Sequence, residues 1–222
     1  MADQMTIRFV LGATRQGRRP QSAFDRRFAA SSERLIGPKR PKCKAGISEA
    51  SVECGLAGRQ LRCVNALMKV RPFQESDAAA LAEIFFTAVH EIAGAHYGEE
   101  QIQAWAPAIP SADRFLARAR DGRTLLVAVD DDDLPIAYGD CEADGHVDHL
   151  FCRPGYSRKG VAAALYEELE RTVRTAGISR LYVEASEPAR RFFEKHGFAV
   201  ESRNDFEIGG VPIHNWRMAK EL

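Results

Sequence analysis

The sequence lacks the features that mark membrane-bound and secreted proteins. It has no run of about 18 uncharged apolar residues, the minimum that a membrane-spanning helix needs. Its first residues hold only a short apolar patch with no cleavage-type pattern after it, so a secretory signal is not expected. With 45% hydrophobic and 28% charged residues, the chain reads as a soluble globular protein of the cytoplasm.

Cysteine is scarce, and its spacing fits neither a disulfide scaffold nor a zinc site. The count is odd and no CxxC pair occurs. The acidic run Asp130–Asp133 has no further ligands at a fixed spacing, which favours a solvated turn over a cation site. We therefore expect no metal. The five cysteines are Cys43, Cys54, Cys63, Cys141 and Cys152.

The net charge of zero conceals two unlike segments. Residues 1–67 hold 13 basic and 5 acidic residues, a net +8, so residues 68–222 carry −8. Residues 1–67 show no sustained hydrophobic period, which predicts a disordered basic extension. A translation start misplaced upstream of Met68 explains this best. A transit peptide and a nucleic-acid docking tail are the alternatives.

Patterned sequence begins at Met68 and predicts a single α/β domain over residues 68–222. Strands are expected at Lys69–Phe73, Thr124–Val129, Ile136–Cys141, His146–Cys152, Leu181–Ala185, Phe198–Ile208 and Pro212–Ala219. Helices are expected from Ser76 or Asp77 to about Ala95, and at Glu99–Trp105, Ala112–Arg120, Arg158–Ala176 and Ala189–His196.

The segment Leu150–Leu165 carries the clearest chemical signal. A strand ends at Arg153-Pro154, a tight loop follows, and a helix opens at Gly160. The free N–H groups and the dipole of a helix N-terminus attract anions, and a glycine lets a phosphate approach the backbone. With Arg158 and Lys159 beside it, this loop reads as a pyrophosphate cradle.

The loop before Gly160 differs from two other phosphate-binding motifs, and it also has a non-functional interpretation. A P-loop needs Gly-Lys-Ser/Thr, but Lys159 precedes the glycine here. A dinucleotide fingerprint needs three spaced glycines and a later acid, which are missing. The non-functional alternative is a loop with a helix-capping Ser157 and two solvated basic residues.

Three motifs resemble the GNAT acetyltransferase superfamily, and together they cover nearly all of residues 68–222. The Gln/Arg-x-x-Gly-x-Gly/Ala loop of that family stands here as Ser157–Ala162, with Ser at the first position. Ala189–Phe198, ARRFFEKHGF, is similar to the family's A-x-x-F-Tyr-E-K-x-G-F motif. His96–Pro107, HYGEEQIQAWAP, resembles an element of a bacterial branch of uncharacterised GNAT proteins.

The resemblance implies a GNAT fold, with a mixed central sheet of about seven strands and helices on both faces. Two splayed parallel strands would hold acetyl-CoA, the co-substrate, and its pantetheine arm would meet the backbones of Leu150 and Cys152. A backbone N–H near Leu150 would hold the oxyanion. Phe193 would pack on the pantetheine. The pyrophosphate would meet the N–H groups of Arg158, Lys159, Gly160, Val161 and Ala162.

Acetyl transfer to an amine also needs a base and an acid. Strand alternation predicts that His146, Asp148 and Leu150 share a face, so His146 and Asp148 are the candidate bases, ahead of Glu142 and Glu184. The family's tyrosine that protonates the leaving thiolate is replaced by Phe193. The remaining candidates for this acid are Tyr156, Ser186 and water.

The acceptor itself is not named by the sequence. We expect the acceptor to be a small-molecule or peptide amine, and we expect neither a membrane nor a nucleic acid as a partner. The sequence does not decide whether the protein forms a homodimer. Two alternatives remain: a CoA-binding regulatory module without catalysis, and a protein- or RNA-directed acetyltransferase that docks through residues 1–67. The candidate wall residues are His90, His96, Tyr97, Trp105, His214, Asn215 and Trp216.

Overall fold

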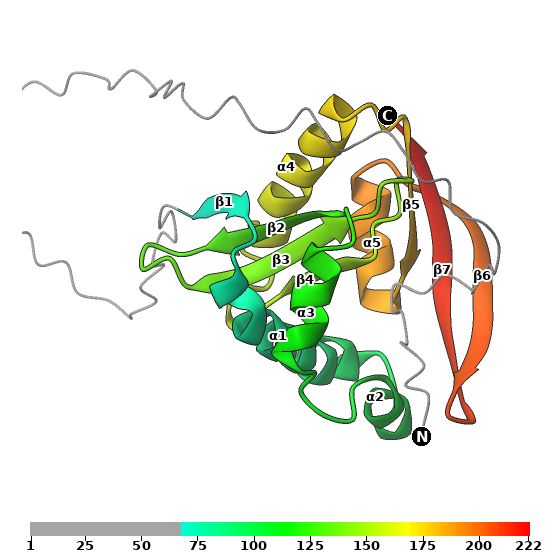
Figure 1. The fold of residues 1–222 in the computed structure, drawn as a ribbon. Helices are drawn as coiled ribbons and strands as arrows, with labels where there is room; N and C mark the ends of the chain where they lie inside the picture. The colour runs from blue at the N-terminus through cyan, green and yellow to red at the C-terminus, as the bar shows by residue number, and fades with distance from the viewer. Residues whose placement is uncertain (1–67) are drawn as a thin grey trace, which may run out of the picture. The chain divides into compact units, whose positions relative to one another are not determined.

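The computed structural model describes residues 68–222, in which seven strands form two antiparallel sheets (Figure 1). The predictions for residues 1–67 lie outside the described residues. The first sheet has the order β1 (Lys69–Pro72), β2 (Thr124–Val129), β3 (Pro135–Cys141) and β4 (His149–Cys152). The second has the order β5 (Arg180–Ala185), β7 (Val211–Glu221) and β6 (Ala199–Ile208).

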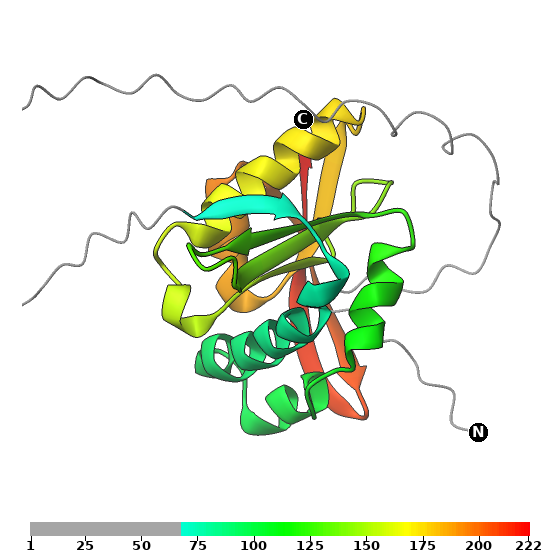
Figure 2. The same cartoon turned by 60° about the vertical axis from the view of Figure 1, so that its left-hand side comes forward.

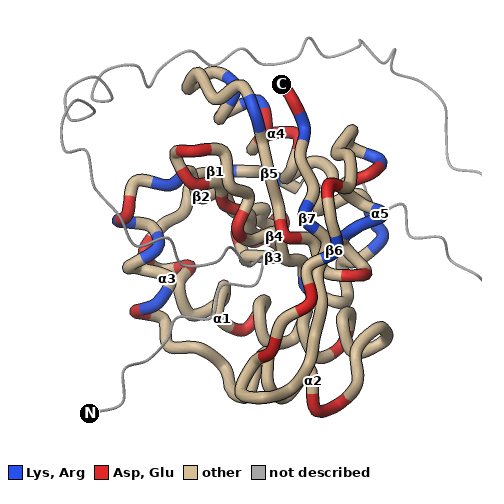
Figure 3. The backbone as a smooth tube through the Cα atoms, turned by 90° about the vertical axis from the view of Figure 1, so that its right-hand side faces the viewer, with Lys and Arg blue, Asp and Glu red and all other residues tan. Residues whose placement is uncertain are grey.

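Helices cover both faces of the first sheet (Figures 1 and 2). One face carries α1 (Ala78–Thr87) and α3 (Ala112–Ala119), and the other carries α4 (Val161–Thr175). The helix of α1 continues as a π-helical segment, Ala88–Ile92, and a 3-10 turn, Ala93–Ala95. Two further helices pack on the second sheet: α2 (Glu99–Trp105) against β6 and β7, and α5 (Glu187–Lys195) against β5 and β7. Figure 3 shows basic residues gathered on α5.

Each helical layer buries its own apolar core. On α4, Val161, Leu165, Leu169 and Val173 are buried at the predicted four-residue spacing. The helical stretch Glu75–Ala95 is the one part of the described chain that is long and apolar enough to cross a membrane. This stretch is a core helix of the domain, because Leu81, Ile84, Phe85 and Val89 are buried with residues of α2 and α3 in a second core, separate from the one below α4.

One parallel bridge joins the two sheets, between His146 and Tyr182. The Val147 N–H donates to the Tyr182 carbonyl at 2.9 Å, and the Tyr182 N–H donates to the Gly145 carbonyl at 3.0 Å. After this bridge β4 and β5 diverge, and β5 pairs with β7 on its other side. The α/β class and the GNAT-type splay predicted from the sequence are confirmed.

Several element boundaries differ from the prediction by one to three residues, and two of these differences have a local reason. The strand β4 begins at His149 and not at His146, since the Asp148 carboxylate turns toward Arg118 of α3. Consequently Leu150 packs in the core below α4, and the predicted common face of His146, Asp148 and Leu150 is wrong. The helix α4 begins at Val161 and not at Arg158, because Gly160 has a φ of +85° and cannot continue a right-handed helix.

Candidate active site

The N-terminus of α4 has the form expected of an anion cradle. Gly160 is its N-cap residue and has no side chain with which to satisfy the N–H groups of the first turn. Arg158 adopts a φ of +62°, and Arg158, Lys159 and Gly160 are exposed. Ser157 precedes the helix and is not its N-cap residue, which removes the helix-capping interpretation.

The edge of β4 that faces β5 offers unpaired backbone groups. In an antiparallel pair, alternate residues direct their N–H and C=O groups to the partner strand. Arg153 directs its N–H to Ile136 of β3 at 2.8 Å, so Leu150 and Cys152 direct their backbone groups away from β3. They therefore point into the gap that the splay leaves open, where an extended ligand can bind as an added strand.

An apolar cavity of about 170 Å³ lies at this gap and reaches both helical layers. Among the residues proposed to bind the cofactor, Leu150, Cys152, Ala162 and Phe193 line it, whereas Arg158, Lys159, Gly160 and Val161 do not. The remaining lining comes from the π-helical region, from Trp105 and from α5 with the residues that precede it. These further residues are Ala88, Val89, Ile92, Ala93, Phe151, Ser157, Ser186, Pro188, Ala189 and Phe192.

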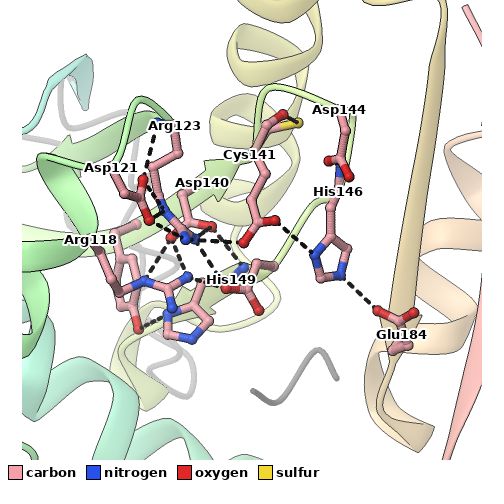
Figure 4. A network of polar contacts seen from close by, with 12 residues as sticks. Arg118, Asp121, Arg123, Asp140, Cys141, Asp144, His146, His149 and Glu184 are labelled. Carbon is pink, nitrogen blue, oxygen red and sulfur yellow. Dashed lines mark hydrogen bonds and ion pairs between the residues drawn. The ribbon is translucent and has the colours of Figure 1, made fainter. Parts of the chain in front are cut away.

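A second, smaller cavity of about 40 Å³ shares Leu150, Phe193 and Ser186 with the first and adds Glu184. The Glu184 side chain projects from β5 toward His146, and its carboxylate lies 2.7 Å from the imidazole Nε2 (Figure 4). On the other side of the ring, Nδ1 lies 3.8 Å from the carboxylate of Glu142. His146 and Glu184 are only 2% and 5% exposed, so this is a buried acid–base pair at the cavity.

The charge of the His146 imidazolium is favoured by its neighbours. Burial alone lowers the pKa of a histidine, but the nearby carboxylate of Glu142 and the hydrogen bond to Glu184 outweigh this and raise the pKa of His146 to about 9. The ring also stacks on Tyr182 at 4.7 Å between centroids, which fixes its orientation.

Asp148, the other candidate base, lines neither cavity and belongs to a buried ion-pair network. Figure 4 shows Arg118, Arg123 and Asp140 of this network. Its carboxylate accepts hydrogen bonds from Arg118 at 2.5 Å and from Arg123 at 3.0 Å. Asp140 binds the same two guanidinium groups. Burial opposes ionisation, but the surrounding positive charges, Arg118 among them, hold the pKa of Asp148 below its ordinary range.

Most of the candidate wall residues lie away from these cavities. Trp105 lines both of them. His96 is exposed, and the His90 Nε2 lies 2.8 Å from the Ala106 carbonyl. The buried Asn215 accepts a hydrogen bond from Asn204. The three others gather around Glu187, whose carboxylate is bound by His214 and Trp216 and whose N–H donates to the hydroxyl of Tyr97.

The structure reduces the number of side chains that could protonate the leaving thiolate. Phe193 is 1% exposed and packs against Tyr166 and Phe198, as a ring without a proton to give. Tyr156 donates to Asp130 and lines neither cavity. Ser186 lines both cavities together with Leu150, the predicted position of the thioester. In the part of the chain that is described, no three metal-binding side chains converge on one point.

Comparison with known proteins decides the family. The family profile described as an acetyltransferase (GNAT) domain matches residues 93–222. The chain belongs to the GNAT acetyltransferase family. It is an acetyl-CoA-dependent acyltransferase, and the resemblance drawn from its three motifs is confirmed.

Individual relatives agree with this GNAT assignment. The chain is 30% identical to the uncharacterised N-acetyltransferase YafP of Escherichia coli over 151 residues, which cover 68% of this chain and 94% of YafP. A solved GCN5-related N-acetyltransferase of Rhodopseudomonas palustris has 32% identity and a TM-score of 0.64, over 69% of this chain and 95% of that one. A putative acetyltransferase, YncA of Salmonella typhimurium, was solved with acetyl-CoA. Its TM-score is 0.55 at 20% identity, with 69% of this chain and 93% of that one covered, which shows the shared fold.

The buried arginine network of this GNAT enzyme was missed from the sequence. A signal for it existed, since Asp140 and Asp148 stand in segments that otherwise read as buried strands, and buried carboxylates require charged partners. Arg118 also falls on the buried face of α3 together with Phe115. These two anomalies predict a buried ion pair, although they do not say which acid pairs with which arginine.

Proposed function

We propose that the protein transfers an acetyl group from acetyl-CoA to the nitrogen of an amine. The observation that carries this proposal is the connection of three features in one place. The exposed N-terminus of α4 adjoins the splay between β4 and β5, and the cavity at the splay ends against the buried pair of His146 and Glu184. An anion cradle, an extended slot and an acid–base pair are what this reaction requires.

The basic loop before α4 and the apolar lining of the cavity suit the two ends of acetyl-CoA. The pyrophosphate would lie on the N–H groups from Arg158 to Ala162, next to exposed Arg158 and Lys159. The pantetheine arm would add to the free edge of β4 at Cys152 and Leu150, against Phe193. Cys152 lines this path as an inert thiol, because burial raises its pKa to about 11.

The acetyl carbonyl would then lie beside Leu150, whose N–H points into the gap and can stabilise the oxyanion. The amine would attack from the side of Trp105 and Phe151, lose its proton to the acid–base pair, and release the CoA thiolate. Ser186 or water would protonate the thiolate. We assign Asp148 to support of the site, since two arginines already engage its carboxylate.

Among the acceptors, a small-molecule or peptide amine fits the cavities of this chain. A non-catalytic CoA-binding module is the second candidate, and Phe193 at the family's tyrosine position is the observation that favours it. The two candidates make different predictions for turnover but the same prediction for acetyl-CoA binding.

A turnover assay with acetyl-CoA and a broad library of primary amines tests the proposal. We expect CoA release that depends on at least one amine, together with the acetylated product. Tight acetyl-CoA binding without transfer to any amine would establish the non-catalytic module instead.

The cradle is tested separately by calorimetry. Gly160→Glu adds a negative side chain where the pyrophosphate would lie, so acetyl-CoA binding should be lost. Gly155→Ala is the matched control, because Gly155 has an ordinary φ and a Cβ there meets no atom within 4 Å. Wild-type affinity in Gly160→Glu would overturn the placement of the cofactor.

A further inference from the structure

We propose that Glu184 accepts the proton of the acceptor amine, and that His146 releases a proton toward Glu142 in exchange. Glu184 is thus the catalytic base, and His146 and Glu142 are positioning residues behind it. This inference rests on the proposed transfer to an amine and names the groups that perform its proton transfer.

Glu184 is in the right place to meet an incoming amine. It lines the 40 Å³ cavity together with Leu150, the residue beside which the thioester would lie. Among the described residues that line either cavity, it is the one with a charged side chain. A buried carboxylate at an apolar cavity favours a cationic partner, so a protonated amine would be bound and oriented by the group that deprotonates it.

A continuous line of groups leads from Glu184 toward the surface. One oxygen of Glu184 lies 2.7 Å from Nε2 of His146, and Nδ1 of the same ring lies 3.8 Å from an oxygen of Glu142. The side-chain exposure is 5% at Glu184, 2% at His146 and 21% at Glu142, so Glu142 is the end of the line that solvent reaches. Arg123 binds the other oxygen of Glu142 at 3.0 Å and fixes its orientation.

The groups around His146 fix its position and favour its protonated form. Asp144 holds the main chain of His146, since the His146 N–H donates to its carboxylate at 3.1 Å. Tyr182 of β5 stacks on the ring and directs its hydroxyl to Asp144. Asp148 adds a negative charge from the same loop, and Arg217 of β7 stands opposite Glu184 in the sheet. With four carboxylates around it, the ring rests as an imidazolium.

The proton balance of the step is closed. In the resting state the Glu184 carboxylate accepts the Nε2–H of the imidazolium. The ammonium form of the amine transfers one proton to the second oxygen of Glu184, and the freed lone pair forms the bond to the acetyl carbon. When the C–S bond then breaks, the nitrogen loses its second proton, and the CoA thiolate takes up one proton by way of Ser186 or water. His146 then gives its Nδ1 proton to Glu142 or to solvent, so the pair of Glu184 and His146 is neutral before and after. After product release, Glu184 loses its proton and the ring regains one.

The kinetic test compares amines that need a base with amines that do not. Benzylamine is a cation at neutral pH, whereas aniline is already neutral. In Glu184→Gln, turnover of benzylamine should fall by about 10²-fold or more at neutral pH. The loss should shrink as the pH approaches the pKa of the amine, and aniline should lose much less. Glu142→Gln should lower turnover without changing acetyl-CoA affinity.

Glu201→Gln on β6 is the matched control, because it also removes an ion-paired carboxylate but lies outside both cavities. It should behave as the wild type. A loss in Glu184→Gln that is equal at every pH and for both amines would show a structural role and overturn the inference.

A spectroscopic test does not depend on finding a good acceptor. Nitrogen NMR of histidine-labelled protein should show both ring nitrogens of His146 protonated up to a pH of about 9. Glu184→Gln and Glu142→Gln should each lower that midpoint. A wild-type midpoint at the ordinary histidine value would overturn the proton exchange. Failure of every amine in the library, with the NMR result as expected, would overturn the proposed acceptor instead.

Discussion

At the scale of single residues, identical carboxylates acquire different tasks from their surroundings. Asp148 and Glu184 are both almost completely buried. Two guanidinium groups bind the first, while one imidazole binds the second and leaves it open to a cavity. The sequence favoured Asp148 and His146 as the catalytic base, because the alternation of a strand was assumed to run through both residues. Both lie before β4, which begins at His149. The pairing of His146 with a residue 38 positions away has no local signature.

The role of Asp148 leads to a stability prediction. Asp148→Asn leaves Arg118 and Arg123 with a deficit of negative charge in a buried place, so the free energy of unfolding should fall by about 3 kcal/mol or more. Urea titration measures this. Asp121→Asn is the control, because Asp121 binds the same Arg123 from a position that is 44% exposed, and the expected loss is below about 1 kcal/mol. A stable Asp148→Asn protein with altered pH dependence of turnover would restore Asp148 as a base.

The raised pKa of His146 predicts a pH-dependent stability. Because the folded-state pKa of about 9 lies above the ordinary value of 6.5, the contribution is fully present below pH 6.5 and is lost as the pH rises through 9. The free energy of unfolding should fall by about 3 kcal/mol across this window. His146→Asn should flatten this slope, whereas substitution of the exposed His96 by Asn should leave it unchanged. An equal slope in His146→Asn would contradict the ion pair with Glu184.

At the scale of elements, the periodic spacing of apolar residues predicted the helices and strands most accurately. The spacing on α4 and the strand segments of β2 and β5 were predicted closely because burial on one face dictates them. Boundaries failed where one contact overrides the pattern, as when Asp148 turns to Arg118 before β4 begins. The π-helical segment Ala88–Ile92 was not predicted, since residues 76–95 contain no proline and their sequence is typical of one uninterrupted helix.

The connection between the two sheets depends on a glycine. A Cβ at Gly145 would lie 2.1 Å from the carbonyl oxygen of Arg180, and the φ of +94° is unfavourable for any other residue. Gly145→Ala should therefore lower the free energy of unfolding by about 3 kcal/mol or more, because strain and a backbone clash add. Urea titration with acetyl-CoA calorimetry is the measurement, and binding should weaken as the splay is disturbed.

Gly122→Ala separates strain from the clash. Gly122 has nearly the same φ of +92°, but a Cβ there meets nothing within 4 Å. Only the conformational cost remains, about 1 kcal/mol. Equal losses in the two variants would show that the close approach between the sheets does not matter for stability.

At the scale of the whole molecule, the sequence predicted the fold class and the family, and it identified the loop before α4 that we propose binds the cofactor. These follow from local motifs at fixed spacings, such as Ser157–Ala162. The arrangement of the active site depends on contacts between distant elements, which motifs do not encode. The network of Arg118 and Arg123 with Asp140 and Asp148 is of this kind, since it joins α3 to two strands.

The matched GNAT domain lies within residues 68–222, and we propose that these residues form the functional unit. A polypeptide that begins at Met68 should melt within about a degree of the full chain and keep its acetyl-CoA turnover, since a contact worth 1 kcal/mol would shift the midpoint by about 2–4 °C. Calorimetry and the turnover assay measure both. A larger shift that disappears at high salt would reveal docking of the +8 segment on the −8 domain.

The π-helical segment Ala88–Ile92 has a consequence for the shape of the cavity. A turn closed by bonds to the fifth residue holds one residue more than an α-helical turn. Ala88, Val89, Ile92 and Ala93 of this region form one wall of the cavity. Removal of one residue here would restore an α-helical turn and rotate the part of the wall on one side of the deletion by about 100°, the angle of one α-helical residue. The extra residue therefore determines which side chains this wall presents.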